Sequence, residues 1–270
     1  MDVAAKIAVE GVAKVFGDPV RGFRAIDGVD LSVRQGEFLC IVGPSGCGKS
    51  TLIRMMAGLE TPTAGAIRMR HDDPARPLTA MIFQQESVFP WLTVAQNAAY
   101  GLQASGTWRG AESRERVEYF LHKTGLYSFR DFRPGQLSGG MKQRLSIARA
   151  FATNPEILLM DEPFAALDEQ NKLLMQQELA SLWEEFRSTV VFITHGLDEA
   201  VLLGDRVVVM SSAPGRFIRN MEITLPRPRD SIALRRTAEV AAMTAELWET
   251  LRTEVEAARQ QESQRLGATA

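Results

Sequence analysis

The residues best suited to chemistry in this chain lie in the segment 43–50, called here the glycine loop. It reads Gly-Pro-Ser-Gly-Cys-Gly-Lys-Ser, follows the apolar run 38–42 and precedes a helical pattern. Glycines let the backbone curl with its N–H groups pointing inward, and a helix N-terminus adds partial positive charge, so the segment predicts a phosphate-binding loop. Lys49 can reach phosphate oxygens, and the Ser50 hydroxyl can ligate Mg²⁺. The alternative, a glycine-rich turn that carries Lys-Ser by coincidence, leaves the flanking strand and helix unexplained.

Two carboxylates, Asp161 and Glu162, follow the segment 156–160, which is apolar after its first residue, Glu156. That run predicts a buried parallel strand, and open α/β sheets bind ligands beyond the carboxyl ends of such strands. Asp161 can hold Mg²⁺ through its waters, and Glu162 can polarise an attacking water. An acidic surface turn is the alternative, but apolar residues run right up to the pair.

Gln84 and His195 follow two further predicted strands, 79–83 and 189–193. The Gln84 amide can ligate Mg²⁺ or hold a water, and the His195 imidazole can donate a hydrogen bond to a γ-phosphate oxygen. Taken alone, each is explained more simply as a solvated glutamine or a structural histidine. Their roles therefore depend on the other residues at that sheet edge.

Two more features have competing interpretations. Ser138, Gly139 and Gly140 open a predicted helix at 142–152 and so offer a second anion site, although a plain N-cap with flexible glycines is the alternative. Phe16 ends a predicted strand, where its ring can either stack on an adenine base or fill the core.

Composition describes an ordinary globular protein. The 270 residues are 45% hydrophobic and 24% charged, enough for one large α/β domain or a domain with a subdomain. A net charge of −2 excludes a strong overall field toward nucleic acid or anionic lipid. Cys40 and Cys47 form no motif, so we expect reduced thiols in the cytoplasm. There is no basic leader before an apolar stretch and no apolar run near the roughly 18 residues of a membrane span, so we expect neither export nor insertion.

Hydrophobic periodicity predicts an alternation of strands and helices. Predicted strands are 7–9, 13–16, 29–33, 38–42, 66–69, 79–83, 156–160, 189–193, 206–210 and 217–223, with turns at 17–19 and 27–28. One predicted helix begins at residue 49, and five others cover 94–102, 111–124, 142–152, 169–186 and 197–203. An apolar stripe predicts a C-terminal helix packed on the body or on a partner chain: Val240, Met243, Leu247, Leu251 and Val255.

Taken in order, the motifs resemble those of the ATP-binding cassette (ABC) family of transport ATPases over residues 5–225. Residues 43–50 resemble the family's Walker A loop, Gln84 its Q-loop glutamine, and residues 137–140 its signature sequence. Residues 157–162 resemble the Walker B strand with its catalytic glutamate, residues 165–168 the D-loop, and His195 the switch histidine. A Walker A loop alone occurs in many unrelated proteins, but a signature sequence shortly before Walker B is nearly diagnostic.

The resemblance implies an α/β fold: a P-loop NTPase (RecA-like) core with a mostly parallel sheet, an N-terminal antiparallel β subdomain and an inserted α-helical subdomain. It implies a nucleotide-binding domain over 1–225 with the insert at about 87–147, and a C-terminal helical extension over 226–270 whose tail is frayed. It also implies ATP hydrolysis with Mg²⁺. The implied nucleotide-binding residues are Phe16, Gly43, Pro44, Ser45, Gly46, Cys47, Gly48, Lys49, Ser50 and Thr51. Implied catalytic residues are Glu162, His195 and Gln84, and implied metal ligands are Ser50, Gln84 and Asp161.

Within the family, the chain looks most like ATPase subunits of nitrate, sulfonate and taurine importers. The resemblance rests on Phe83-Gln84 followed by residues 89–93, on Met141, and on the strand 207–210 leading to Pro214-Gly215-Arg216. Two residues depart from the family pattern. Met141 replaces a glutamine, which should be tolerated, and Gly196 replaces an aspartate, which leaves the orientation of His195 open.

The implied partners are a second copy of the chain, a membrane permease and, indirectly, a solute-binding protein. In a head-to-tail dimer, Ser138, Gly139 and Gly140 of one copy would cover the ATP held by Lys49 of the other. We expect the permease to dock on residues 84–92, and the subunit to be cytoplasmic and peripheral on the inner face of the membrane. The solute stays open, because separate chains select it.

Two other classes of function compete with this interpretation. A soluble cassette protein acting on nucleic acid or ribosomes would usually carry two cassettes or long coiled-coil insertions and a basic surface, and the sequence has none, so no nucleic-acid partner is expected. A small-molecule kinase would leave Ser138, Gly139 and Gly140 without a role.

Overall fold

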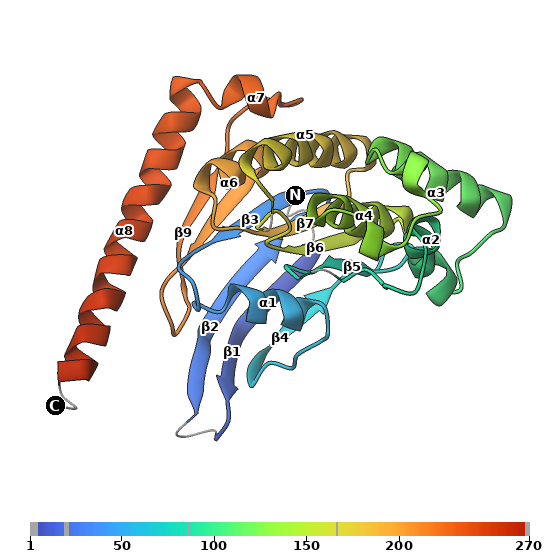
Figure 1. Ribbon diagram of the computed structural model, residues 1–270. Helices are drawn as coiled ribbons and strands as arrows, with labels where there is room; N and C mark the ends of the chain where they lie inside the picture. Colours follow the sequence, from blue (N-terminus) through green and yellow to red (C-terminus); the bar gives the residue numbers. More distant parts are fainter. Residues whose placement is uncertain (1–4, 19–21, 86, 166, 268–270) are drawn as a thin grey trace. The chain divides into compact units, whose positions relative to one another are not determined.

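The computed structural model describes residues 5–18, 22–85, 87–165 and 167–267 of the chain. These residues divide into two compact units. Figure 1 labels their helices and strands. The first unit contains the described residues up to Arg70 together with those from Phe192 onward, and the second is His71–Val191. The boundary falls within strand β7 (Thr189–Ile193).

The first unit begins with a three-stranded antiparallel sheet. The central strand β1 (Ile7–Phe16) pairs with β2 (Phe23–Val33) on one side and with β4 (Ala64–Met69) on the other. Every second residue at the start of β1 is buried, as expected for a sheet with one face on the core. The prediction of an antiparallel N-terminal subdomain thus has its counterpart in the structure.

Two details of this sheet were predicted wrongly. The segment 7–16 is one strand rather than two, because register shifts absorb the break between Val9 and Lys14. The predicted turn at 27–28 is also wrong, since β2 starts at Phe23 and continues through it. Gly28 has a positive φ of 65° and lies where the register against β1 shifts, so turn-type residues here form a bulge instead of a turn.

A second group of strands in the first unit has two fully buried members, β3 (Phe38–Val42) and β8 (Arg206–Met210), and a mostly exposed one, β9 (Phe217–Glu222). Strand β3 pairs in parallel with β8, and β8 pairs antiparallel with β9. All residues of β3 and β8 are buried, as continuous apolar runs in parallel sheets require. Helix α1 (Lys49–Met56) follows β3, and α6 (Leu197–Leu203) contacts both β3 and β8.

The C-terminal part of the first unit is helical. A short helix α7 (Ser231–Leu234), which was not predicted, precedes the long helix α8 (Ala238–Gly267). Three residues of the predicted stripe, Val240, Leu247 and Leu251, are buried, and α8 contacts α6 and β8. The side chain of Val255 lies outside the described residues. The boundaries 1–225, 87–147 and 226–270 stay a prediction.

The second unit combines two parallel strands with a group of helices. Strand β5 (Thr79–Ile82) pairs with β6 (Ile157–Asp161) so that Ile82 lies beside Met160. The helices are α2 (Val94–Ala104), α3 (Ala111–Lys123), α4 (Gly139–Ala152) and α5 (Glu169–Phe186), with short 3₁₀ turns at Tyr127–Phe129 and Pro134–Gln136. Helices α2 and α3 pack on α4. No helix in the described ranges has the length and apolar composition needed to cross a membrane.

A buried ion pair ties the start of β3 to β8 in the first unit. Glu37 and Arg206 are both buried, and the Arg206 Nε donates to Glu37 Oε1 at 2.6 Å. Both charged groups make further hydrogen bonds. The Arg34 backbone N–H donates to Glu37 Oε2 at 2.6 Å, and the Arg206 guanidinium donates to the Ser32 carbonyl. Such a pair is costly to break from one side, since the other charge stays buried.

We therefore expect Glu37→Ala to lower the free energy of unfolding by about 3 kcal/mol or more. Thermal or urea unfolding measures this. The matched control is Glu222→Ala, which removes an exposed partner of Arg34 at 3.1 Å and should cost no more than about 1 kcal/mol. Equal losses in the two variants would show that the buried pair has no special weight.

Candidate functional site

The glycine loop joins β3 to α1 in the first unit. Its backbone turns through left-handed conformations at Gly46 (φ 76°) and Gly48 (φ 103°), and Gly48 is the N-cap of α1. Residues other than glycine adopt these angles only with strain. The structure therefore has the strand–loop–helix arrangement that presents a helix N-terminus to an anion.

Close backbone contacts hold both ends of the glycine loop. A Cβ added to Gly43 would lie 2.6 Å from the carbonyl oxygen of Met210. A Cβ on Gly48 would lie 2.8 Å from Ile26 Cγ1 and 2.9 Å from the Ala25 carbonyl oxygen. These two glycines are thus required by packing against β8 and β2.

The Lys49 ammonium lies inside the curl of the loop. Its side chain is nearly buried (4% exposed), and Nζ donates to the carbonyl oxygens of Gly43 at 2.9 Å and Pro44 at 2.8 Å. Cys47 Sγ is 3.6 Å away, and burial raises the pKa of this thiol despite the opposing charge of Lys49. The thiol is therefore neutral at ordinary pH, and the loop carries net positive charge. Cys40 and Cys47 are both free and buried.

Phe16 is partly exposed rather than buried in the core. Its residue exposure is 41%, and Lys14 Nζ lies 4.9 Å from the centre of its ring. The core-filling alternative is therefore not supported. An exposed ring with a cation beside it suits contact with a flat, electron-rich base.

His195 follows β7 and is exposed. The turn around it is fixed by its buried neighbours Thr194 and Glu199, whose side chains hydrogen-bond to each other. The Gly196 backbone N–H donates to Thr194 Oγ1 at 2.9 Å, and Gly196 is the N-cap of α6. The glycine that departs from the family pattern is thus held through its backbone.

In the second unit, the structure brings Gln84 and Glu162 together. Gln84 Nε2 donates to Glu162 Oε2 at 2.9 Å. Asp161, the last residue of β6, and Glu162 are both buried. Glu162 has a positive φ of 47°, which costs a residue with a Cβ about 1 kcal/mol or more. Strain of this kind concentrates at functional positions, so it marks Glu162 as a candidate.

Ser138 begins helix α4 as a true N-cap. Its Oγ accepts from the Met141 backbone N–H at 3.3 Å, and Ser138 and Gly139 are exposed. Because of this cap, α4 starts at Gly139, earlier than predicted. A Cβ on Gly140 would lie 3.5 Å from Leu167, so this helix start contacts the segment 165–168 within the same unit.

The segment 165–168 ends in a second N-cap. Asp168 caps α5 by accepting from the Asn171 backbone N–H at 2.9 Å, and this hydrogen bond lowers the pKa of the Asp168 carboxyl. Ala166 lies outside the described residues.

Two residues that sequence reasoning missed hold the segment 87–93, called here the docking segment. Asn97 is fully buried in α2. Its Oδ1 accepts from the Phe89 N–H at 2.8 Å, and its Nδ2 donates to carbonyls of Phe89 and Thr93 at 3.1 and 3.0 Å. Arg149 of α4 donates to the Ser87 carbonyl and hydroxyl at 2.9 and 2.8 Å. A polar residue inside the apolar face of a predicted helix was the available signal.

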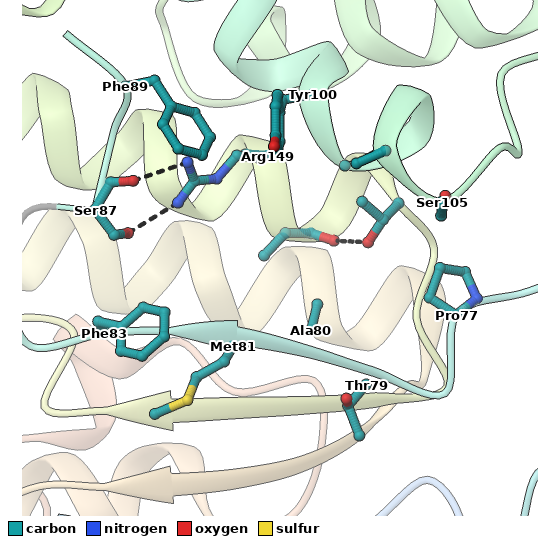
Figure 2. A pocket seen from close by; sticks show the side chains of 14 residues that line it. Pro77, Thr79, Ala80, Met81, Phe83, Ser87, Phe89, Tyr100, Ser105 and Arg149 are labelled. Carbon is teal, nitrogen blue, oxygen red and sulfur yellow. Dashed lines mark hydrogen bonds between the residues drawn. The ribbon is translucent and has the colours of Figure 1, made fainter. Parts of the chain in front are cut away.

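A pocket of about 610 Å³ lies beneath the docking segment (Figure 2). Its walls are mainly apolar and include Met81, Phe83, Phe89 and Tyr100, and the guanidinium of Arg149 lies 5.3 Å from the centre of the Phe89 ring. Burial lowers the pKa of Arg149.

Three apolar residues of the docking segment differ in exposure. Trp91 is 65% exposed, whereas Phe89 and Leu92 are half-buried. The Phe89 ring packs against Tyr100 with centroids 4.4 Å apart. The exposed apolar surface expected here is therefore supplied mainly by Trp91 and the pocket mouth.

With this geometry in place, comparisons define the class of protein. The ABC transporter family model matches residues 26–165. A dimeric ATP-binding cassette in a post-hydrolysis state, bound to ADP and Pi, superimposes with a TM-score of 0.71 at 32% identity and covers 82% of this chain and 100% of that one. The predicted fold class, a P-loop NTPase, is thereby confirmed.

Two curated relatives carry names that concern transport. The nitrate import ATP-binding protein NrtD of Synechococcus elongatus is 43% identical over 83% of this chain and 83% of its own length. The bicarbonate transport ATP-binding protein CmpD of the same organism is 41% identical over 83% and 82%. The chain belongs to the ABC transporter family and is an ATP-binding ATPase subunit of that family.

The close contacts of Gly48 lead to a testable difference between two loop glycines. Gly48→Ala adds both backbone strain and a clash with Ile26, whereas Gly46→Ala adds only strain because no atom lies within 4 Å of its Cβ position. We expect Gly46→Ala to cost about 1–2 kcal/mol of unfolding free energy and Gly48→Ala distinctly more.

Thermal unfolding without nucleotide measures both costs. Indistinguishable variants would mean that β2 does not constrain the loop.

Proposed function

We propose that this chain is the ATP-hydrolysing subunit that energises import of a small solute through a separate membrane permease. The solute belongs to the nitrate, sulfonate and taurine class of compounds. The names of two relatives, one for nitrate import and one for bicarbonate transport, support a small anion. The subunit would lie at the cytoplasmic face of the membrane, held there by the permease.

The observation that carries the proposal is the docking segment with its pocket. Trp91 is the most exposed large apolar residue of the second unit, and an apolar pocket opens beside it. Exposed apolar surface of this kind marks a site for another protein. A short helix of a permease is the expected occupant, while Asn97 and Arg149 hold the surface in shape.

For nucleotide binding, we assign the adenine to Phe16 and the phosphates to residues 43–51. The loop N–H groups and the dipole of α1 favour the anion, and Lys49 would exchange its carbonyl partners for phosphate oxygens. Phosphate oxygens carry more negative charge than carbonyls, so they bind the ammonium more strongly.

We assign a magnesium ion to three residues on the chemistry of their side chains. Ser50, Gln84 and Asp161 supply oxygen atoms, which Mg²⁺ prefers, and an ion bound to nucleotide phosphates needs only one or two protein ligands. Across the described residues, no group of three or more His, Cys, Asp or Glu side chains could hold a metal by itself. The ion would arrive with the nucleotide, since Mg²⁺ is usually held by one or two protein ligands together with substrate phosphates, and it would neutralise charge on those phosphates.

The in-trans assignment explains the second helix start. Ser138 and Gly139 are exposed at the N-terminus of α4, which suits them to cover ATP held by a second copy of the chain. The dimeric state of a similar cassette supports this arrangement. Glu162, oriented by Gln84, would polarise the attacking water, and His195 would contact the γ-phosphate.

The alternative of a soluble cassette acting on nucleic acid or ribosomes is not favoured. The relatives' names concern transport, and the chain carries no net positive charge. A pull-down from membrane-free extract that recovered nucleic acid instead of a permease would support it.

Replacing Glu162 by Gln should separate ATP binding from hydrolysis. The isosteric amide can still accept the Gln84 hydrogen bond but cannot act as a base, so we expect ATP turnover to fall by about 100-fold or more while ATP is retained. Size-exclusion chromatography with ATP should then show a trapped dimer.

Lys49→Ala is the control, because it should lose ATP and therefore remain monomeric. Undiminished turnover in Glu162→Gln would remove this residue from its role.

Charging Trp91 should uncouple the subunit from its permease. We expect Trp91→Asp to reduce permease co-purification and solute uptake by at least about tenfold, since an exposed anchor of an interface is lost. Leu174→Asp is the matched control, because Leu174 is also exposed (51%) but belongs to α5 and not to the docking segment.

Uptake that survives Trp91→Asp would contradict the docking proposal. The solute itself would be found by a ligand screen on the cognate binding protein.

A further inference from the structure

The segment 210–216, called here the Pro-Gly-Arg loop, closes on itself after β8. The Ser211 backbone N–H donates to the Arg216 carbonyl at 2.8 Å, and the Arg216 N–H donates to Ser211 Oγ at 2.9 Å. Ser211 Oγ also donates to the Pro214 carbonyl at 3.4 Å. These internal bonds make the loop a compact unit that can transmit a displacement.

The Pro-Gly-Arg loop contacts the glycine loop at both ends. At one end, Gly43 packs on the carbonyl of Met210. At the other, Gly215 packs on Cys47 so closely that an added Cβ would lie 2.1 Å from the Cys47 carbonyl oxygen. A shift of residues 210–216 would therefore move the backbone of the glycine loop directly.

The Pro-Gly-Arg loop is also hydrogen-bonded to β2, the strand that packs against Gly48. The Gly215 N–H donates to the Ala25 carbonyl at 2.9 Å, and the Asp27 N–H donates to the Gly215 carbonyl at 3.1 Å. Arg216 also pairs with the Asp27 carboxylate, and this hydrogen bond lowers the pKa of Asp27. The Ala25 carbonyl is also the one that lies against Gly48. Together with the contact between Met210 and Gly43, the Pro-Gly-Arg loop and its partner strand therefore reach both closely packed glycines of the glycine loop, Gly43 and Gly48.

Helix α8 fastens the tip of the Pro-Gly-Arg loop. Glu254 Oε2 accepts from the Ser212 backbone N–H at 3.3 Å and from the Ser212 hydroxyl at 3.4 Å. Leu251, one turn earlier, is buried and anchors this part of the helix, which is drawn in red in Figure 1. A carboxylate that accepts two hydrogen bonds from one residue restrains both its backbone and its side chain.

We propose that Glu254 is a positioning residue for nucleotide binding, which acts through Ser212 and the Pro-Gly-Arg loop on the shape of the glycine loop. The inference rests on the proposed binding of ATP by residues 43–51. It gives the C-terminal helix a role in ATP affinity, although no residue of that helix touches the glycine loop in the contacts described above.

The test compares ATP binding and turnover in four variants of the full chain. Glu254→Ala should raise the Kd for ATP roughly threefold to tenfold, the change expected when a supporting hydrogen bond is lost. Turnover at saturating ATP should stay within about twofold, because Glu254 touches no reacting group. Glu254→Gln should restore the wild-type Kd, since its amide oxygen can accept both Ser212 donors.

Glu246→Ala is the matched control on the same helix. It removes an ion pair between α8 and Arg219 of β9 without touching the Pro-Gly-Arg loop, so the Kd for ATP should not change. Equal weakening by Glu246→Ala would assign the effect to helix docking in general and overturn the proposal.

A second result would overturn it as well: an unchanged Kd in Glu254→Ala while Lys49→Ala loses ATP. That result leaves the proposed function intact, whereas a wild-type chain that binds no ATP would refute the proposed function itself.

Discussion

The structure depends on a backbone constraint: the glycine loop keeps its curl because neighbouring atoms, carbonyl oxygens and the Ile26 side chain, fill the space where the side chains of Gly43 and Gly48 would be. Gly43 meets the carbonyl of Met210, and Gly48 meets Ala25 and Ile26. The walls are effective because they are rigid. Strands β3 and β8 are buried along their whole length, and the Glu37–Arg206 pair fixes β8 beside the start of β3. Packing of β3 and β8 thus helps to fix the backbone angles of the glycine loop, and with them the directions in which its N–H groups point.

The charge inside that curl also needs support. An ammonium that is almost fully buried is unfavourable unless acceptors surround it, and the carbonyls of Gly43 and Pro44 supply them. The buried ammonium of Lys49 therefore has hydrogen-bond acceptors within the loop itself. Under the proposed function, binding ATP exchanges one set of acceptors for another, so Lys49 need not be newly desolvated. In the second unit, the hydrogen bond from Gln84 similarly fixes the position of the Glu162 carboxylate.

Much of this could be predicted from sequence because the signals are local. Apolar runs bounded by glycine, proline or capping residues gave most strands and helices, and parallel strands such as β5 and β6 bring Gln84 and Glu162 to one edge. The failures have non-local causes. Asp27-Gly28 became a bulge because β1 continues beside it. Asn97, Arg149 and the tie between Glu254 and Ser212 depend on which segments meet in three dimensions, and periodicity carries no record of that.

Asn97 separates the support of the docking segment from its exposed surface. It holds the docking segment through main-chain atoms of Phe89 and Thr93, while the neighbouring Trp91 side chain is left to the surface. The residue that supports the backbone and the residue that supplies the exposed apolar surface are therefore different ones. Under the proposed function, substitutions at exposed positions of the segment would change the surface offered to a permease while the Asn97 hydrogen bonds keep the backbone beneath in place.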